Sequence, residues 1–246
     1  MGDPELAEEK LIPNFWWNNH PDWAVMEGPY FKFKGNYKLV VDNLLDGSHV
    51  SFLHSSTLGT EAVADITTKT KSDKLNVRSE RWIIDKPPAP MYQRIGNFKG
   101  NVDRWQLIDF VPPSNVVLDT GSCNTGQGKD NGFNLVPINS MTPENNKSTH
   151  VFWSHTRNFD LHSLDTSNLI RKQMTTAWSE DIFMMEQQQK RLNESNRPFI
   201  SVKIDNAPER ARKIIESLIH EEINNSCSIC PIEERIKAGH LFGVTT

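Results

Sequence analysis

Two histidines, His49 and His54, are separated by four residues in the run DNLLDGSHVSFLH, which spans residues 42–54. Imidazole nitrogens are ligands for iron, zinc, copper and nickel, and a loop or a distorted helix can bring both rings to one point. The same spacing also occurs in pairs of histidines that are exposed or hydrogen-bonded. The pair is therefore a candidate metal site that needs a further ligand from elsewhere in the chain.

Asp181 is a candidate third ligand because it lies in a predicted helix, within a stripe of mostly apolar residues that recur every three or four positions. Such a stripe is typical of core packing, and a carboxylate within it would need a cation, a hydrogen-bond donor or a metal ion. Asp181 could instead lie on the helix surface beside Glu180. Two histidines and one remote carboxylate form the ligand set of non-haem Fe(II) oxygenases, which leaves coordination positions open for O₂ or substrate. The other members of the stripe are Met174, Ala177, Trp178, Met184, Met185 and Gln188.

The elements that must position these residues can be read from the hydrophobic pattern. The pattern predicts a helix or a helical loop over 36–45. It also predicts a long helix that is capped at 165–168 and ends near residue 193, followed by a helix over 207–224. Residues 141–146 are predicted as a turn, and the aromatic residues of 1–29 are expected to pack onto a core. Strands followed by late helices predict an α+β fold with an antiparallel sheet. The predicted strands are 30–34, 67–71, 75–78, 81–84, 105–111, 132–139 and 148–159.

Composition excludes several classes of protein. The 246 residues include 27 Lys and Arg against 31 Asp and Glu, so the net charge of −4 disfavours nucleic acid and anionic membranes as partners. No apolar run approaches the ~20 residues that a membrane span needs, and the acidic N-terminus does not resemble a signal peptide. Three cysteines do not form a secreted-type disulfide framework. We therefore expect a cytoplasmic protein.

The 42–54 run resembles the iron-binding segment in the catalytic domain of Rieske-type aromatic-ring oxygenases, in particular the vanillate O-demethylase oxygenase-like subgroup. The most specific part is the spacing of Asn43, Asp46, His49 and His54. The resemblance extends over nearly the whole chain. It includes the helix around Asp181, the segments 141–144 and 149–159 as paired strands, and residues 3–13 as an interdomain linker.

The resemblance implies a helix-grip fold, START-like and Bet v1-like, in which an antiparallel sheet wraps around a long C-terminal helix. Residues 1–29 would be a linker segment and residues 30–246 a non-haem iron catalytic domain. In that family His49, His54 and Asp181 would bind one mononuclear Fe(II). Asp46 would be the carboxylate that bridges to a neighbouring subunit's Rieske cluster, and it could also orient an imidazole N–H. Asn43 would lie near the iron without binding it strongly.

The cysteines do not fit a Rieske cluster, which needs Cys-x-His and Cys-x-x-His pairs. None of Cys123, Cys227 and Cys230 is followed by a histidine at either spacing. We therefore expect the Rieske domain and its [2Fe–2S] cluster to be absent from this chain, which would be a piece of a longer protein or would take electrons from a separate one. Cys227 and Cys230 follow a predicted helix, unlike a redox motif, and zinc would need two more ligands.

Two residues occupy positions where some members of the family place polar substrate contacts. Asn139 comes just before the predicted 141–146 turn, and Lys172 lies nine residues before Asp181. Lys172 could meet a carboxylate of the substrate, but it is also typical of a solvent-facing lysine. These positions predict no particular substrate.

Three functions remain open. The first is an oxygenase that uses Fe(II) and O₂ to hydroxylate, oxidatively demethylate or cis-dihydroxylate an aromatic or similar apolar molecule. Its electrons would come from a Rieske domain, ferredoxin or reductase. The family also implies a ring of subunits, most often a homotrimer. We expect the isolated chain to be a monomer or a loosely associated trimer. The second is a helix-grip module that binds an apolar ligand without turnover. The third is a zinc hydrolase. The sequence has no obvious glutamate beside the histidines to act as its general base, since the nearest one is Glu61.

Overall fold

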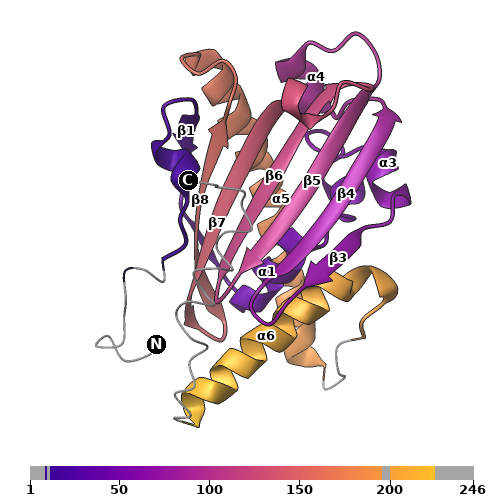
Figure 1. Ribbon diagram of the computed structural model, residues 1–246. Helices are drawn as coiled ribbons and strands as arrows, with labels where there is room; N and C mark the ends of the chain where they lie inside the picture. Colours follow the sequence, from indigo (N-terminus) through magenta and orange to yellow (C-terminus); the bar gives the residue numbers. More distant parts are fainter. Residues whose placement is uncertain (1–8, 10–11, 196–199, 225–246) are drawn as a thin grey trace.

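The computed structural model describes residues 9, 12–195 and 200–224. Within them, one antiparallel sheet packs against a long helix, and Figure 1 shows the sheet with this helix behind it. The strands lie in the order β1-β8-β7-β6-β5-β4-β3, and β2 also pairs with β8. The strands are β1 (Ala24–Glu27), β2 (Phe31–Phe33), β3 (Lys69–Ser72), β4 (Val77–Lys86), β5 (Val102–Val111), β6 (Asn115–Asn124), β7 (Phe133–Asn145) and β8 (Ser148–Arg157).

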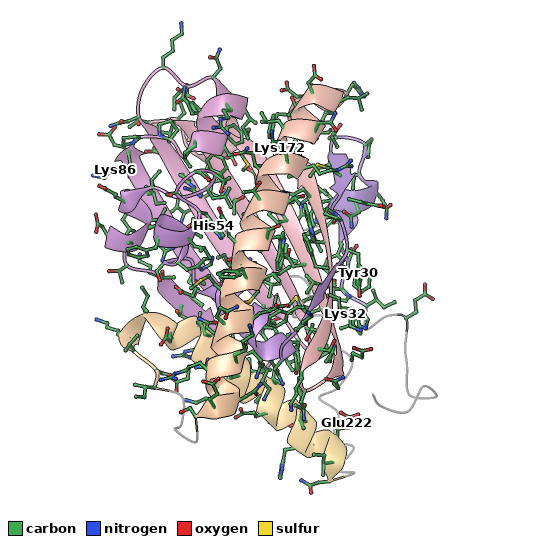
Figure 2. The ribbon with its side chains drawn as sticks, turned by 180° about the vertical axis from the view of Figure 1, so that it is seen from behind. Tyr30, Lys32, His54, Lys86, Lys172 and Glu222 are labelled. Atoms are coloured by element: carbon green, nitrogen blue, oxygen red, sulfur yellow. The ribbon has the colours of Figure 1, made fainter. Side chains whose placement is uncertain are left out.

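The long helix α5 (Leu164–Glu194) crosses one face of the sheet, as Figure 2 shows from behind. It begins after Ser163, whose Oγ accepts a hydrogen bond from the N–H of Thr166 at 3.1 Å, a normal N-terminal cap. The predicted α+β fold, an antiparallel sheet on a long late helix, is confirmed. The other helices are α1 (Tyr37–Leu45), α2 (Val50–Leu53), α3 (Glu61–Asp65), α4 (Pro90–Gly96) and α6 (Asn206–Ile223).

The main core lies between α5 and the sheet. Alternate residues of each strand point to this inner face, so that Phe110 of β5 and Met141 of β7 join Trp178 and Met185 of α5 in one buried cluster. The opposite face is covered in part by the N-terminal aromatics. Trp17, in the 3-10 turn η3 (Trp16–Asn19), is buried against β6 and β7, as we expected for residues 1–29.

Several element predictions differ from the structure. The segments 75–78 and 81–84, predicted as separate strands, are joined in the single strand β4, and β1 was not predicted. Residues 141–144 belong to β7 and pair with β8, and the chain turns only between Asn145 and Ser148; a register irregularity between Pro143 and Asn145 lets the strand pass the proline. Strand β6 was not predicted, because its second half consists of small and polar residues. It is a central strand nevertheless, and Gly121 has no room for a side chain because the Trp105 ring lies against it.

Three further features concern helix α6, the cysteines and the question of a membrane span. Helix α6 lies across one end of the sheet and packs against α1 (Figure 1). Cys123 is a buried free thiol, whereas Cys227 and Cys230 lie outside the described residues. In the part of the chain that the structure describes, no helix combines the length and the apolar character required to cross a membrane.

Candidate metal centre and adjoining cavity

A single helical turn brings the two histidines together. Helix α1 ends at Leu45, the chain turns through residues 46–48, and the one-turn helix α2 is bounded by His49 on one side and His54 on the other. The two imidazole ring centres lie 5.2 Å apart, with the ring planes at 81°. The His-x₄-His spacing thus places both rings at one point, as a distorted helix allows.

Asp181 reaches the same point from α5. It lies in the buried stripe of that helix, together with Met174, Trp178 and Met185. Its Oδ1 atom is 3.1 Å from His54 Nε2 and 3.5 Å from His49 Nε2. One potential ligand atom from each of the three residues lies within 4.8 Å of the other two.

The other nitrogen of each ring fixes which atoms face this point. His49 Nδ1 contacts the main-chain oxygen of Asp46, and His54 Nδ1 lies 2.7 Å from Glu180 Oε2. Both oxygens can only accept, so each Nδ1 donates its proton. In the neutral rings both Nε2 atoms therefore carry lone pairs toward Asp181 Oδ1, which is buried and has no hydrogen-bond partner among the described residues. Three lone pairs that converge without a donor are the arrangement of a cation site.

The carboxylates around His54 favour its protonated form. Burial alone would lower the pKa of His54, but the carboxylates of Asp181 and Glu180 outweigh burial and raise that pKa above its ordinary value. A positive charge is thus favoured at this point. A bound cation would compete with a proton for this position.

Asp46 and Asn43 lie beside the histidines. The main chain of Asp46, rather than its carboxylate, contacts His49, and Asp46 Oδ1 accepts hydrogen bonds from the N–H (2.9 Å) and Oγ (2.5 Å) of Ser48. Gly47 lies against Arg81 Nη1, so a side chain at this position would have to displace the end of Arg81. Asn43 Nδ2 is buried without a partner. The hydrogen bonds from Ser48 to Asp46 therefore stabilise the turn that presents His49.

A cavity adjoins the three side chains and extends between α5 and the inner face of the sheet. It encloses about 740 Å³ of space free of protein atoms, including its mouth. Its lining includes Asn139, whose Nδ2 donates to the main-chain oxygen of Val116 at 3.1 Å. Lys172 is exposed on α5 and does not line the cavity; Figure 2 labels it on this helix, apart from His54. Apolar lining residues include Leu44, Leu58, Met91, Ile108, Met174 and Trp178.

Three polar groups here were not predicted as site residues; the sequence left open which way His155 faces, and Glu180 was noted only as the neighbour of Asp181. His155 lines the cavity with both ring nitrogens unpartnered, and burial lowers its pKa to about 3, so the ring is neutral. Arg104 lines the cavity from β5, and Glu180 orients His54 from outside it. Residues 104, 106, 108 and 110 lie on the same face of β5. The apolar residues Ile108 and Phe110 were therefore the sequence signal that Arg104 lies on an inward face.

Comparison with known proteins agrees with this geometry. The family model described as the vanillate O-demethylase oxygenase C-terminal domain matches residues 33–221. The toluene-4-sulfonate monooxygenase system iron-sulfur subunit of Comamonas testosteroni is 32% identical over 234 residues, which are 90% of this chain and 67% of that protein. The vanillate O-demethylase oxygenase subunit of Pseudomonas sp. (strain ATCC 19151) is 32% identical over 232 residues, which are 90% of this chain and 70% of that protein.

A solved structure shares the fold. The crystal structure of dicamba monooxygenase bound to 3,6-dichlorosalicylic acid matches with a TM-score of 0.83 and 26% sequence identity, over 92% of this chain and 67% of that one. The present chain thus spans about two thirds of the length of these relatives. Fold, sequence and family model agree, and the chain belongs to the vanillate O-demethylase oxygenase C-terminal domain family, as an oxidoreductase catalytic domain of the Rieske-type oxygenases.

Proposed function

We propose that His49, His54 and Asp181 bind one mononuclear Fe(II), and that the domain uses O₂ to hydroxylate or oxidatively demethylate an aromatic molecule in the adjoining cavity. The observation that supports this most directly is the convergence of three lone pairs, including a buried carboxylate oxygen without a donor, at the cavity wall. The relatives named above are called monooxygenases or demethylases. Another dicamba monooxygenase structure is described as containing non-heme iron.

The residues of this chain have separable roles in such a reaction. Two imidazoles and one carboxylate leave coordination positions open, and bound Fe(II) would supply the activation of O₂. Asp46, through its main chain, and Glu180 hold the two rings in the orientation that presents Nε2. The apolar wall excludes water and receives the substrate ring. Asn139 and neutral His155 supply polar contacts that could orient the substrate.

Electron supply and assembly belong to the same proposal. The name of one relative identifies it as an iron-sulfur subunit, and we propose that a Rieske domain, ferredoxin or reductase outside the described residues delivers electrons. Asp46 and His49 are only partly buried, so this side of the site can be reached from a neighbouring protein. In a homotrimeric ring the Asp46 carboxylate would bridge to the neighbour's cluster.

Iron content tests the metal assignment. Anaerobic reconstitution of the purified chain should give about one Fe per chain, because the three residues form one ligand set. His49→Ala removes a ligand and should lose most of this iron, whereas His162→Ala, at an exposed position, should retain it. Undiminished iron in the His49 variant would refute the assignment.

The same measurement addresses the alternative of a ligand-binding module without turnover. If the wild-type chain binds apolar aromatics but holds neither iron nor zinc after reconstitution, the module is the better description. Iron at one equivalent together with O₂-dependent product formation in the presence of a donor would favour the oxygenase.

A further inference from the structure

Arg81 is a buried arginine of β4 that does not line the cavity. It is 3% exposed. Its three side-chain nitrogens all donate to neutral oxygens: Nε to the main chain of Ile66 at 3.2 Å, Nη1 to Gln106 Oε1 at 3.1 Å and Nη2 to Thr68 Oγ1 at 2.7 Å. The guanidinium is therefore fixed between the loop that follows α3 and the cavity wall at Gln106.

The 46–48 turn, which presents His49, lies on this guanidinium. Gly47 is so close to Arg81 Nη1 that a side chain at position 47 would displace the end of the arginine. The main-chain oxygen of Asp46, in the same turn, contacts His49 Nδ1. One short piece of main chain thus separates Arg81 from a candidate metal ligand.

The charge of Arg81 acts on the same turn. Burial lowers the pKa of Arg81, the carboxylate of Asp46 opposes this effect, and the second cation Arg104 adds to it. Asp46 is therefore the negative charge that favours the guanidinium, although the hydrogen bonds of Arg81 go elsewhere. A buried charge is costly even when it is hydrogen-bonded. This cost favours a role of Arg81 in the site over a role in stability alone.

Strand β4 also contacts the segment that follows His49. Ile83 lies two residues after Arg81, on the same face of the strand. It shares one buried cluster with Val50, the residue after His49. The inner face of β4 therefore supports the chain both before and after the histidine.

We propose that Arg81 is a positioning residue of the candidate metal centre: its fixed guanidinium holds the 46–48 turn, and the turn holds His49 in the orientation that binds the metal. The proposal rests on the proposed function in one respect, namely that His49, His54 and Asp181 bind a metal ion. Arg81 donates no hydrogen bond to these three side chains and does not line the cavity, so it acts through the turn.

Cobalt(II) binding to the purified, iron-free chain tests this without any activity measurement. Co(II) accepts imidazole and carboxylate ligands, and its visible absorption bands report the coordination geometry. Arg81→Met should lower Co(II) affinity, measured against a competing chelator, by about 10–100-fold, the usual effect of losing a group that orients a ligand. It should also change the absorption bands. Arg81→Lys, which keeps the charge but not all three hydrogen bonds, should be intermediate.

Gly47→Ala tests the contact from the side of the turn. Its methyl group would displace the guanidinium, so it should lower Co(II) affinity in the wild-type background. In the Arg81→Met background the guanidinium is already gone, and Gly47→Ala should have little further effect. Such a failure of additivity is expected for two residues in direct contact.

Arg78→Met is the matched control. Arg78 lies three residues earlier in β4 and therefore on the opposite face of the sheet. It donates to both carboxylate oxygens of Asp109 at 2.6 Å. Its loss should lower the thermal stability of the chain but leave Co(II) affinity and the absorption bands at their wild-type values.

Four results would overturn the proposal. Arg81→Met could bind Co(II) as the wild type does, Arg78→Met could lose as much affinity as Arg81→Met, or the effects of Gly47→Ala and Arg81→Met could be fully additive. If Arg81→Met does not fold, Arg81→Lys and Gly47→Ala still decide. The fourth result, a wild-type chain that binds no Co(II), differs from the others because it would refute the metal assignment itself and this proposal with it.

Discussion

Glu180 lies one residue before Asp181 and touches His54 on the side away from the other ligands. Its Oε2 atom accepts from His54 Nδ1 at 2.7 Å, while Asp181 Oδ1 approaches Nε2 of the same ring. Carboxylates in this position set the tautomer and orientation of a ligating histidine. We predict that Glu180→Ala lowers iron affinity about 10–100-fold, which a competitive chelator titration would measure. Glu194→Ala, at an exposed position of the same helix, is the control; equal affinities in both variants would contradict the role of Glu180.

Helices α1 and α6 are joined by a partly buried ion pair that predicts a pH dependence of stability. Arg212 Nη1 lies 2.6 Å from Asp42 Oδ2, but Asp42 Oδ1 is buried without a partner, and burial raises the pKa of Asp42 to about 6 despite the arginine. The folded state therefore holds a proton that the unfolded state releases near pH 4. This contribution is fully present below pH 4 and is lost as the pH rises through 6, by an amount on the order of 3 kcal/mol. Urea unfolding of wild type and Asp42→Asn at pH 4 to 7 should show wild type losing stability relative to the variant; parallel curves would contradict the raised pKa.

Local patterns in the sequence indicated where elements form, but they did not indicate which face of each strand points inward. The spacing of His49 and His54 determines their meeting because one helical turn spans it, and the 3.6-residue period places Asp181 in the buried stripe. His155 and Arg104 are different. Each lies on a strand, where a shift of one residue reverses the two faces, and the correct register depends on neighbouring strands far away in the sequence. The alternation on β5 groups Arg104 with apolar residues, but that the faces of Arg104 and His155 line the cavity could be recognised only once the sheet was known.

Assembly is decided at the scale of the whole molecule. A ring with one repeated interface needs two complementary surfaces on each chain, and the proposed ring would use a cluster-bearing domain on one side and the region of Asp46 and His49 on the other. Two large apolar side chains next to the candidate ligands in the sequence are exposed, Phe52 of α2 (78% exposed) and Phe183 of α5 (64% exposed). Specific, stable interfaces bury about 1,200–2,000 Å² in total, which is far more than two side chains provide. We therefore predict that this 246-residue chain is a monomer or a loose trimer. Light scattering from micromolar to nanomolar concentration should show dissociation on dilution. A trimer that persists at nanomolar concentration would mean that the catalytic domains alone hold the ring together, while the iron assignment would stand.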